Sequence, residues 1–186
     1  MNIEKRSIVI LFVFFLSCGK NIKTVTKVEN MYSKIKKELA PDKRTELFDI
    51  QFHLLNGAII LKGETTSKKA LSRLQDSLKY SQVNFKSEVR ILPDSSLENR
   101  QFAIAKNSVI NIRSNPKHSA ELGTQGLLGM ALRVLDKKGD FYRIQTPDNY
   151  ISWVDKGGIQ RMNKRDFDLW NASKKVLFTN NAGQVF

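Results

Sequence analysis

The hydrophobic and polar positions of this chain follow a helical period first and a strand period afterwards. Four apolar residues recur at helical spacing near the start of the chain: Val28, Met31, Ile35 and Leu39. This stripe predicts an amphipathic helix that ends at Pro41. From residue 46 to residue 55 apolar and polar residues alternate, which predicts a strand with one buried face.

The pair Asn56-Gly57 separates this strand from a second strand, which we expect over residues 58–63. Asn-Gly strongly predicts a two-residue hairpin, because a type I′ turn needs two residues that tolerate positive φ. Thr66 or Ser67 is then expected to cap a helix. The apolar stripe of that helix consists of Leu71, Leu74 and Leu78. Period two returns over residues 83–91, so the order helix, strand, strand, helix, strand predicts a small αββαβ domain.

The second half of the chain consists of short apolar runs broken by glycine and proline turns. Five short strands at 8–12-residue spacing are typical of a small closed β-barrel, which we expect over residues 101–162. Its expected core is Val109, Ile112, Leu122, Leu127, Leu132, Val134, Ile144 and Val154. The predicted fold class is therefore α+β, with the αββαβ domain over residues 26–93 and a polar linker over residues 94–100.

A short helix is expected after the barrel, over residues 163–173, with Asn163 as its cap. Its Phe167 and Trp170 are expected to pack on the barrel rather than form a ligand site. Packing of this kind is needed, because a domain of about 60 residues buries only about 60% of its unfolded surface. Residues 174–186 are apolar at both ends of an Asn-Asn-Ala-Gly turn, which predicts the start of a further β segment.

The start of the chain has the pattern of an export signal. Lys5 and Arg6 precede the unbroken apolar run of residues 8–16. This run is too short to span the roughly 30 Å hydrocarbon core of a bilayer as a helix. The alternatives are a lipoprotein signal and an ordinary secretory signal that contains a chance cysteine.

Residues 15–18, Phe-Leu-Ser-Cys, resemble a bacterial lipobox with Phe15 in place of the usual Leu. The resemblance implies that Cys18, the only cysteine in the chain, is the lipid attachment site. It divides this region into a signal peptide, residues 1–17, and a tether, residues 18–25. Some lipoproteins of this style carry an acidic surface-export tag after the cysteine, and residues 19–25 contain no acidic residue. We therefore expect the protein in the bacterial cell envelope, on the periplasmic face of the outer membrane.

The net charge of +13 is compatible with nucleic acid as a partner. The export signal and the lack of any interleaved basic and aromatic motif argue against that partner. A chain whose only thiol is at Cys18 has no cysteine nucleophile, disulfide or thiolate metal site in its folded domains. His53 stands without a second ligand at metal-binding spacing, and His118 without a paired nucleophile. We expect no catalytic residues, no metal and no cofactor.

Two motifs in the second half resemble a bacterial SH3-like (SH3b) domain. Residues 111–116, Asn-Ile-Arg-Ser-Asn-Pro, match the opening pattern N-(V/I)-R-x-x-P of that family. Residues 150–154, Tyr-Ile-Ser-Trp-Val, match its closing G-W-V with Ser152 in place of the glycine. Many bacteria attach this module to cell-wall proteins. The resemblance implies that the domain binds peptidoglycan peptides or a wall-hydrolase partner.

Four residues of the predicted barrel are candidates for ligand binding. Arg113 could bind a carboxylate, although in the resembled family this position more often stabilises the first loop. The three aromatic candidates could form an exposed shelf for sugar rings or peptide: Tyr142, Tyr150 and Trp153. A place in the core is the alternative for Trp153. Positive charge beside the shelf, suited to anionic wall peptides, would come from Lys106, Lys117 and His118.

The hairpin of the first domain and the order of the modules carry two further resemblances. Gly57, Ile59, Leu61 and Gly63 match the G-x-(V/I)-x-L-x-G pattern of BON-type domains, which occur in bacterial envelope proteins. The module order resembles the N-terminal half of NlpC-type cell-wall cysteine peptidases of Bacteroidetes-type bacteria. Their catalytic cysteine and two histidines have no counterpart here, which favours a non-catalytic envelope protein. The alternative is a truncated targeting part of a γ-D-glutamyl-diamino-acid endopeptidase that lacks its catalytic domain.

Overall fold

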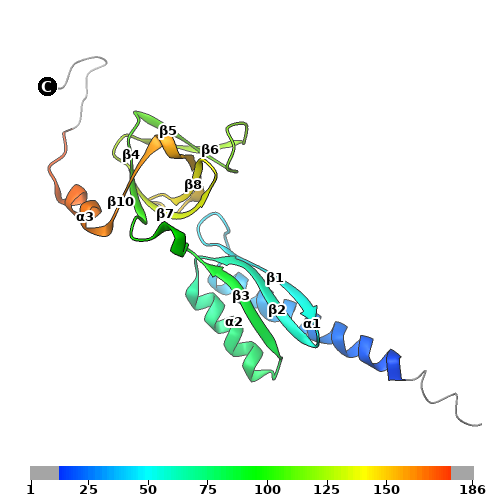
Figure 1. Cartoon of the computed structure of the whole chain (residues 1–186). Helices are drawn as coiled ribbons and strands as arrows, with labels where there is room; N and C mark the ends of the chain where they lie inside the picture. Colours follow the sequence, from blue (N-terminus) through cyan, green and yellow to red (C-terminus); the bar gives the residue numbers. More distant parts are fainter. Residues whose placement is uncertain (1–12, 177–186) are drawn as a thin grey trace, which may run out of the picture.

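The structure is a computed structural model that describes residues 13–176 of the chain, with side chains from residue 23 onward. Two bodies follow one another along the chain, an αβ body and a β-rich body (Figure 1). The chain is thus α+β. The apolar run of residues 8–16 lies mostly outside the described residues, as does most of the β segment expected over residues 174–186.

The first body contains five elements. They are α1 (Val13–Leu39), β1 (Phe48–Leu55), β2 (Ala58–Thr65), α2 (Lys68–Tyr80) and β3 (Phe85–Ile91). This is the element order that the sequence pattern predicts. The strands form one sheet in the order β1-β2-β3, with β1 and β2 antiparallel and β2 and β3 parallel. A parallel pair needs a crossover connection, which α2 supplies.

Local sequence signals place the turn and the helix cap of this body. Asn56 and Gly57 have φ of 50° and 76°, the left-handed values that a type I′ turn requires. Leu55 and Ala58 pair directly across this turn. Ser67, rather than Thr66, caps α2 and accepts a hydrogen bond from the Ala70 N–H at 3.4 Å.

The two helices pack on one face of the three-stranded sheet. The core between the layers includes Val28 of α1, Phe48 of β1, Leu61 of β2 and Leu74 of α2, all at most 1% exposed. Gly63 is required in β2, because a Cβ built there would lie 2.0 Å from the Asp49 carbonyl oxygen. The apolar stripes of the sequence therefore face this core.

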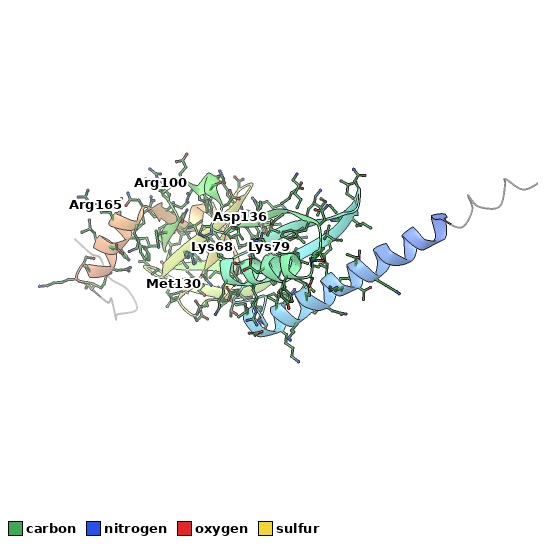
Figure 2. The ribbon with its side chains drawn as sticks, turned by 90° about the horizontal axis from the view of Figure 1, so that it is seen from below. Lys68, Lys79, Arg100, Met130, Asp136 and Arg165 are labelled. Carbon is green, nitrogen blue, oxygen red and sulfur yellow. The ribbon has the colours of Figure 1, made fainter. Side chains whose placement is uncertain are left out.

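Helix α1 is longer than the sequence predicts. It begins at Val13, so the tether expected over residues 18–25 and the backbone of Cys18 both lie within the helix. Figures 1 and 2 show its first turns extending past α2, away from the rest of the molecule. No helix within residues 13–176 has the length and apolar content needed to cross a bilayer.

The second body is a seven-stranded antiparallel sheet with a short helix at its end. Its elements are η1 (Ser95–Leu97), β4 (Phe102–Ala105), β5 (Val109–Arg113), β6 (Leu122–Leu127), β7 (Ala131–Lys138), β8 (Phe141–Gln145), β9 (Ile151–Asp155), η2 (Lys156–Gly158), β10 (Ile159–Met162) and α3 (Lys164–Ala172). The strand order is β10-β4-β7-β8-β9-β5-β6. The strands curl around a common centre (Figure 1). The order nevertheless has two ends, β10 and β6, so the hydrogen-bonded ring expected of a closed barrel is incomplete.

The core of this sheet differs from the expected one at three positions. Five expected residues are buried: Ile112, Leu132, Val134, Ile144 and Val154. Val109, Leu122 and Leu127 are instead 47%, 48% and 65% exposed. Ile110 takes the inward place beside Val109, because neighbouring strand residues point to opposite faces. Leu122 and Leu127 belong to β6, which has a neighbour on one side only.

Helix α3 packs on the sheet through the two aromatic residues that the sequence singles out. Phe167 stacks on Phe102 of β4, with 4.8 Å between ring centres. Trp170 lies against Gly129, where an added Cβ would be 3.5 Å from the indole ring. Asn163 caps the helix by accepting a hydrogen bond from the Asp166 N–H at 2.9 Å. The packing expected of Phe167 and Trp170 is therefore present.

Apolar and backbone contacts join the two bodies. Leu92, Leu135 and Ile151 form a small buried cluster at the junction. The Asp94 N–H donates to the Leu135 carbonyl at 2.8 Å. The Ile151 N–H donates to the Arg44 carbonyl at 2.6 Å. The second body is thus packed against the first.

Charged side chains form a network at the same junction. The Arg90 guanidinium lies 2.8 Å from Glu64, 2.7 Å from Asp136 and 3.2 Å from Asp94. Arg143 of β8 bonds the second oxygen of Glu64. Figure 2 shows Asp136 where the two bodies meet. Burial alone would raise the pKa of Glu64, but the hydrogen bonds from Arg143 and Arg90 outweigh it and hold this pKa below its ordinary value of 4.5.

We expect the Glu64→Gln substitution to lower the free energy of unfolding by about 1–3 kcal/mol at pH 7, because it removes charged hydrogen bonds from two arginines. Chemical denaturation measures this change. Glu88→Gln is the matched control on β3, where the pairs with Lys86 and Lys62 are exposed, and it should change stability little.

The advantage of the native Glu64 also depends on pH. Its pKa is lowered in the folded state, so its stabilising effect is fully present above about pH 4.5. This effect is lost as the pH falls through the folded-state value. Equal pH profiles for the native protein and Glu64→Gln would contradict the role of the network.

Candidate ligand-binding site

A small hollow lies where strand β5 separates from its neighbour β9. Its volume is about 170 Å³. Its polar and aromatic lining includes Asn107, Asn111, Arg113, His118, Phe141 and Asp155. These residues come from β5, β8, β9 and the connections beside them, so the fold gathers them from distant parts of the chain.

The hollow exists because β5 and β9 pair over a short distance only. Ile112 pairs with Val154, and Arg113 pairs with Trp153. After Asp155 the chain turns into η2, and the Asp155 carboxylate caps this turn by accepting a hydrogen bond from the Gly157 N–H at 2.7 Å. The early part of β5 therefore faces η2 rather than a paired strand, and the hollow opens between them.

The rim of the hollow carries a histidine beside a carboxylate. His118 Nε2 lies 3.6 Å from Asp155 Oδ2, and its ring lies 5.0 Å from the Phe141 ring. Nearby, Lys156 bonds Asp140 at 2.6 Å. This hydrogen bond lowers the pKa of Asp140 and raises that of Lys156, which keeps both groups charged.

Arg113 both lines the hollow and supports the neighbouring loop. Its Nη1 donates a hydrogen bond to the Ala120 carbonyl at 2.8 Å. The structure thus shows the loop-stabilising alternative for this residue. A ligand carboxylate would meet a guanidinium whose position is already fixed by the loop.

The structure does not bring the three aromatic candidates together on one exposed shelf. Tyr142 and Tyr150 are half-buried and both pack against the core of the sheet. Tyr142 is opposite Val154 of β9, and Val154 is four residues beyond Tyr150, which directly precedes this strand. Four residues of extended chain correspond to about 13 Å. The Arg161 guanidinium covers the Tyr142 ring at 4.9 Å. The Tyr150 hydroxyl packs against Gly123, because a Cβ added to Gly123 would lie only 2.6 Å from this oxygen.

Trp153 is part of the junction between the two bodies. Its side chain is 6% exposed, which matches the core alternative and not the shelf. The Arg143 guanidinium lies 4.6 Å from the centre of its ring and also bonds Glu64 of the first body. Sequence reasoning missed this role, because Glu64 is far away along the chain.

The sequence analysis did not single out three polar residues of the hollow as contributors to ligand binding: Asn107, Asn111 and Asp155. Asn111 opens the motif of residues 111–116, and Asp155 directly follows the motif of residues 150–154. These positions in or next to the two motifs were the sequence signal that could have identified Asn111 and Asp155 as lining residues. Within the described residues 13–176, no three His, Cys, Asp or Glu side chains gather where they could hold a metal ion.

The placement of Tyr142 gives a prediction about stability. We expect Tyr142→Ala to lower the free energy of unfolding by about 2–4 kcal/mol, because it removes an aromatic ring from the core edge and the partner of Arg161. Tyr80→Ala is the matched control, since Tyr80 is 92% exposed and should contribute little. Equal denaturation midpoints for the two variants would show that the Tyr142 ring does not contribute to the packing of the core.

Comparison with known families gives one match. Residues 112–159 match the family described as "Bacterial dipeptidyl-peptidase Sh3 domain". The matched segment begins in β5 and ends at the first residue of β10, so it includes most of the hollow. The comparison with curated proteins gave no match. The family match supports a bacterial SH3-like domain in this part of the chain, as the motifs at residues 111–116 and 150–154 predict.

Proposed function

We propose that this chain is a non-catalytic, lipid-anchored protein of the bacterial cell envelope. In this proposal its SH3-like domain binds peptidoglycan peptides, or a wall hydrolase, in the hollow beside β5. The family match over residues 112–159 carries the proposal, because SH3-like domains of this kind suggest a cell-wall-binding or peptidase-associated role. The first body resembles BON-type domains, which occur in bacterial envelope proteins. This resemblance is in keeping with an envelope protein and stays a prediction.

The chemistry of the hollow suits a peptide with both acidic and polar groups. Arg113 offers a fixed guanidinium for a carboxylate, and Asn107 and Asn111 offer amide donors and acceptors. Asp155 offers a carboxylate for an amino group of the ligand. Peptidoglycan peptides carry free carboxylates and amines at short spacing, so they can meet these groups together.

Positive charge around the hollow favours an acidic ligand. Lys106 and Lys117 are exposed, and each directly precedes a lining residue, Asn107 and His118 respectively. The whole chain carries a net charge of +13. A field of this sign raises the association rate of anionic wall fragments at low salt. Nucleic acid would share that attraction, so the specific test has to compare the two ligands directly.

We expect His118→Ala to weaken the binding of soluble muropeptides about tenfold, which corresponds to about 1.4 kcal/mol. Its side chain is 77% exposed, so the substitution should leave the fold intact. His53→Ala is the matched control, because His53 is the only other histidine and lies exposed on β1 of the first body. Calorimetric titration with muropeptides measures both variants.

Two outcomes would contradict the proposed site. The first is equal muropeptide affinity for His118→Ala and His53→Ala. The second is displacement of bound muropeptides by oligonucleotides at lower concentration than by muropeptides themselves. Circular dichroism of both variants verifies that the fold is unchanged in each measurement.

Lipid anchoring is proposed from the sequence at Cys18, which resembles a lipobox cysteine. Several acyl chains at roughly 0.8 kcal/mol per buried CH₂ would hold the chain firmly on a bilayer. We propose the periplasmic face of the outer membrane, because residues 19–25 lack an acidic surface tag. Lys23, near the start of α1, would then lie close to the headgroups.

We expect Cys18→Ala to move the protein from the membrane fraction to the soluble envelope fraction, since it removes the acylated atom. Cell fractionation followed by immunoblotting measures the distribution. Ser17→Ala is the matched control next to the same site and should remain in the membrane fraction. An unchanged distribution of Cys18→Ala would refute lipid anchoring.

A second function is favoured by the description of the matching family, which names a dipeptidyl-peptidase. We propose as the alternative that the chain is the N-terminal targeting part of an NlpC-type cysteine peptidase. The intact mass of the native protein in a membrane fraction separates the two. A mass near that of this 21.3 kDa chain favours the first function, and a much larger mass favours the second.

A further inference from the structure

A cleft lies at the junction of the two bodies, beside the linker that joins β3 to β4. Its volume of about 730 Å³ is within the usual range of small-molecule sites. The first body contributes Lys68 and Arg90, the linker and η1 contribute Asp94 and Ser95, and the second body contributes Arg133. None of these residues lines the hollow beside β5, so the cleft is a separate site.

Two charged groups of the cleft already neutralise each other. Arg90 Nη1 donates a hydrogen bond to Asp94 Oδ2 at 3.2 Å, and Asp94 Oδ1 accepts one from the Ser96 N–H at 2.9 Å. The hydrogen bonds from Ser96 hold the pKa of Asp94 below its ordinary value of 3.8, so this carboxylate stays charged. Among the described residues that line the cleft, no other side chain is acidic.

Lys68 and Arg133, by contrast, are cations without a partner. Within residues 23–176, whose side chains the structure describes, neither side chain forms a hydrogen bond or an ion pair. Arg133 lies opposite Phe102 and Gln145 in the sheet, so no carboxylate faces it from the neighbouring strands. Lys68 begins α2, where a cation is unfavourable because the start of a helix is itself positive. Neither charge is therefore explained by the stability of its own element.

The free groups of the cleft match one chemical class of ligand. Two uncompensated cations favour a ligand with two negative charges, and the free hydroxyl of Ser95 adds a third donor. A carboxylate has one charge and two oxygens, whereas a phosphate monoester has about 1.5 to 2 negative charges and three acceptor oxygens. A guanidinium can bond two of these oxygens as a fork, and an ammonium group can bond the third.

We propose that this cleft binds a phosphate monoester, held by Lys68 of the first body and Arg133 of the second. A phosphate group fills only a small part of the cleft, so the ligand also has an organic part. Ile91, which is 41% exposed, and Pro93 offer apolar contacts to that part. The ligand would bridge the two bodies beside the Arg90 network.

Calorimetric titration of the full chain with glycerol 3-phosphate tests the proposal. We expect Lys68→Gln combined with Arg133→Gln to weaken binding at least about a hundredfold, because each charged hydrogen bond accounts for about tenfold. Both side chains are exposed, so the fold should be unchanged.

The matched control is Lys79→Gln combined with Arg165→Gln, which removes the same charge from exposed positions outside the cleft. Figure 2 shows Lys68 and Lys79 at opposite ends of α2, and Arg165 lies on α3. This variant should bind glycerol 3-phosphate as tightly as the native chain does.

A second ligand distinguishes a soluble source of the phosphate from a lipid headgroup. Dihexanoyl phosphatidic acid has the phosphate monoester of glycerol 3-phosphate with two acyl chains added. Equal affinities for the two ligands would support a soluble phosphate monoester, and tighter binding of the lipid would support a headgroup. In both cases the binding should be lost in the Lys68→Gln and Arg133→Gln double variant.

Three outcomes would overturn the proposal. One is that the native chain binds neither phosphate ligand. Another is equal affinity of the two double variants, because binding would then follow the net charge of +13 rather than the cleft. The third is displacement of glycerol 3-phosphate by an equal concentration of acetate, because a single carboxylate would then be sufficient.

Discussion

The ion network around Glu64 is the interaction on which the arrangement of the two bodies depends. Glu64 belongs to β2 of the first body, and it binds Arg90 of the same sheet and Arg143 of the second. Arg143 in turn covers Trp153, which pairs with Arg113 beside the hollow. One carboxylate thus connects the αββαβ body to the strand that shapes the candidate site. Removal of one partner from such a half-buried charge network leaves the remaining charges without compensation.

Signals that act over a few residues were predictable from the sequence. The Asn56-Gly57 turn depends on the φ preference of two adjacent residues, and the Ser67 cap depends on a side chain and an N–H three residues later. The apolar stripe that contains Val28 was also predictable, because an amphipathic helix needs only one apolar layer to pack against. For the same reason the motif residue Arg113 has its loop partner nearby, at Ala120.

Features that depend on distant partners were not predictable in this way. Either Val109 or Ile110 could have faced the core, and the register against β6 decides between them. Trp153 is buried because Arg143 and Glu64 reach it from other elements. Tyr142 and Tyr150 are the same type of residue, but they lie near opposite ends of the β8–β9 strand pair. The hollow arises from the early separation of β5 and β9, which no single motif encodes.

The length of α1 has a mechanical consequence for a protein attached to a membrane. A flexible tether of eight residues would let the domains sample a wide volume around the anchor. Residues 18–24 of α1 instead precede the part of the helix that packs on the sheet from Val25 onward, and they form a stiff rod of about 10 Å. With Cys18 acylated, the distance between the bilayer and the first sheet is set by this rod. In the proposed anchoring at Cys18, this segment would hold the first body at a fixed distance from the bilayer.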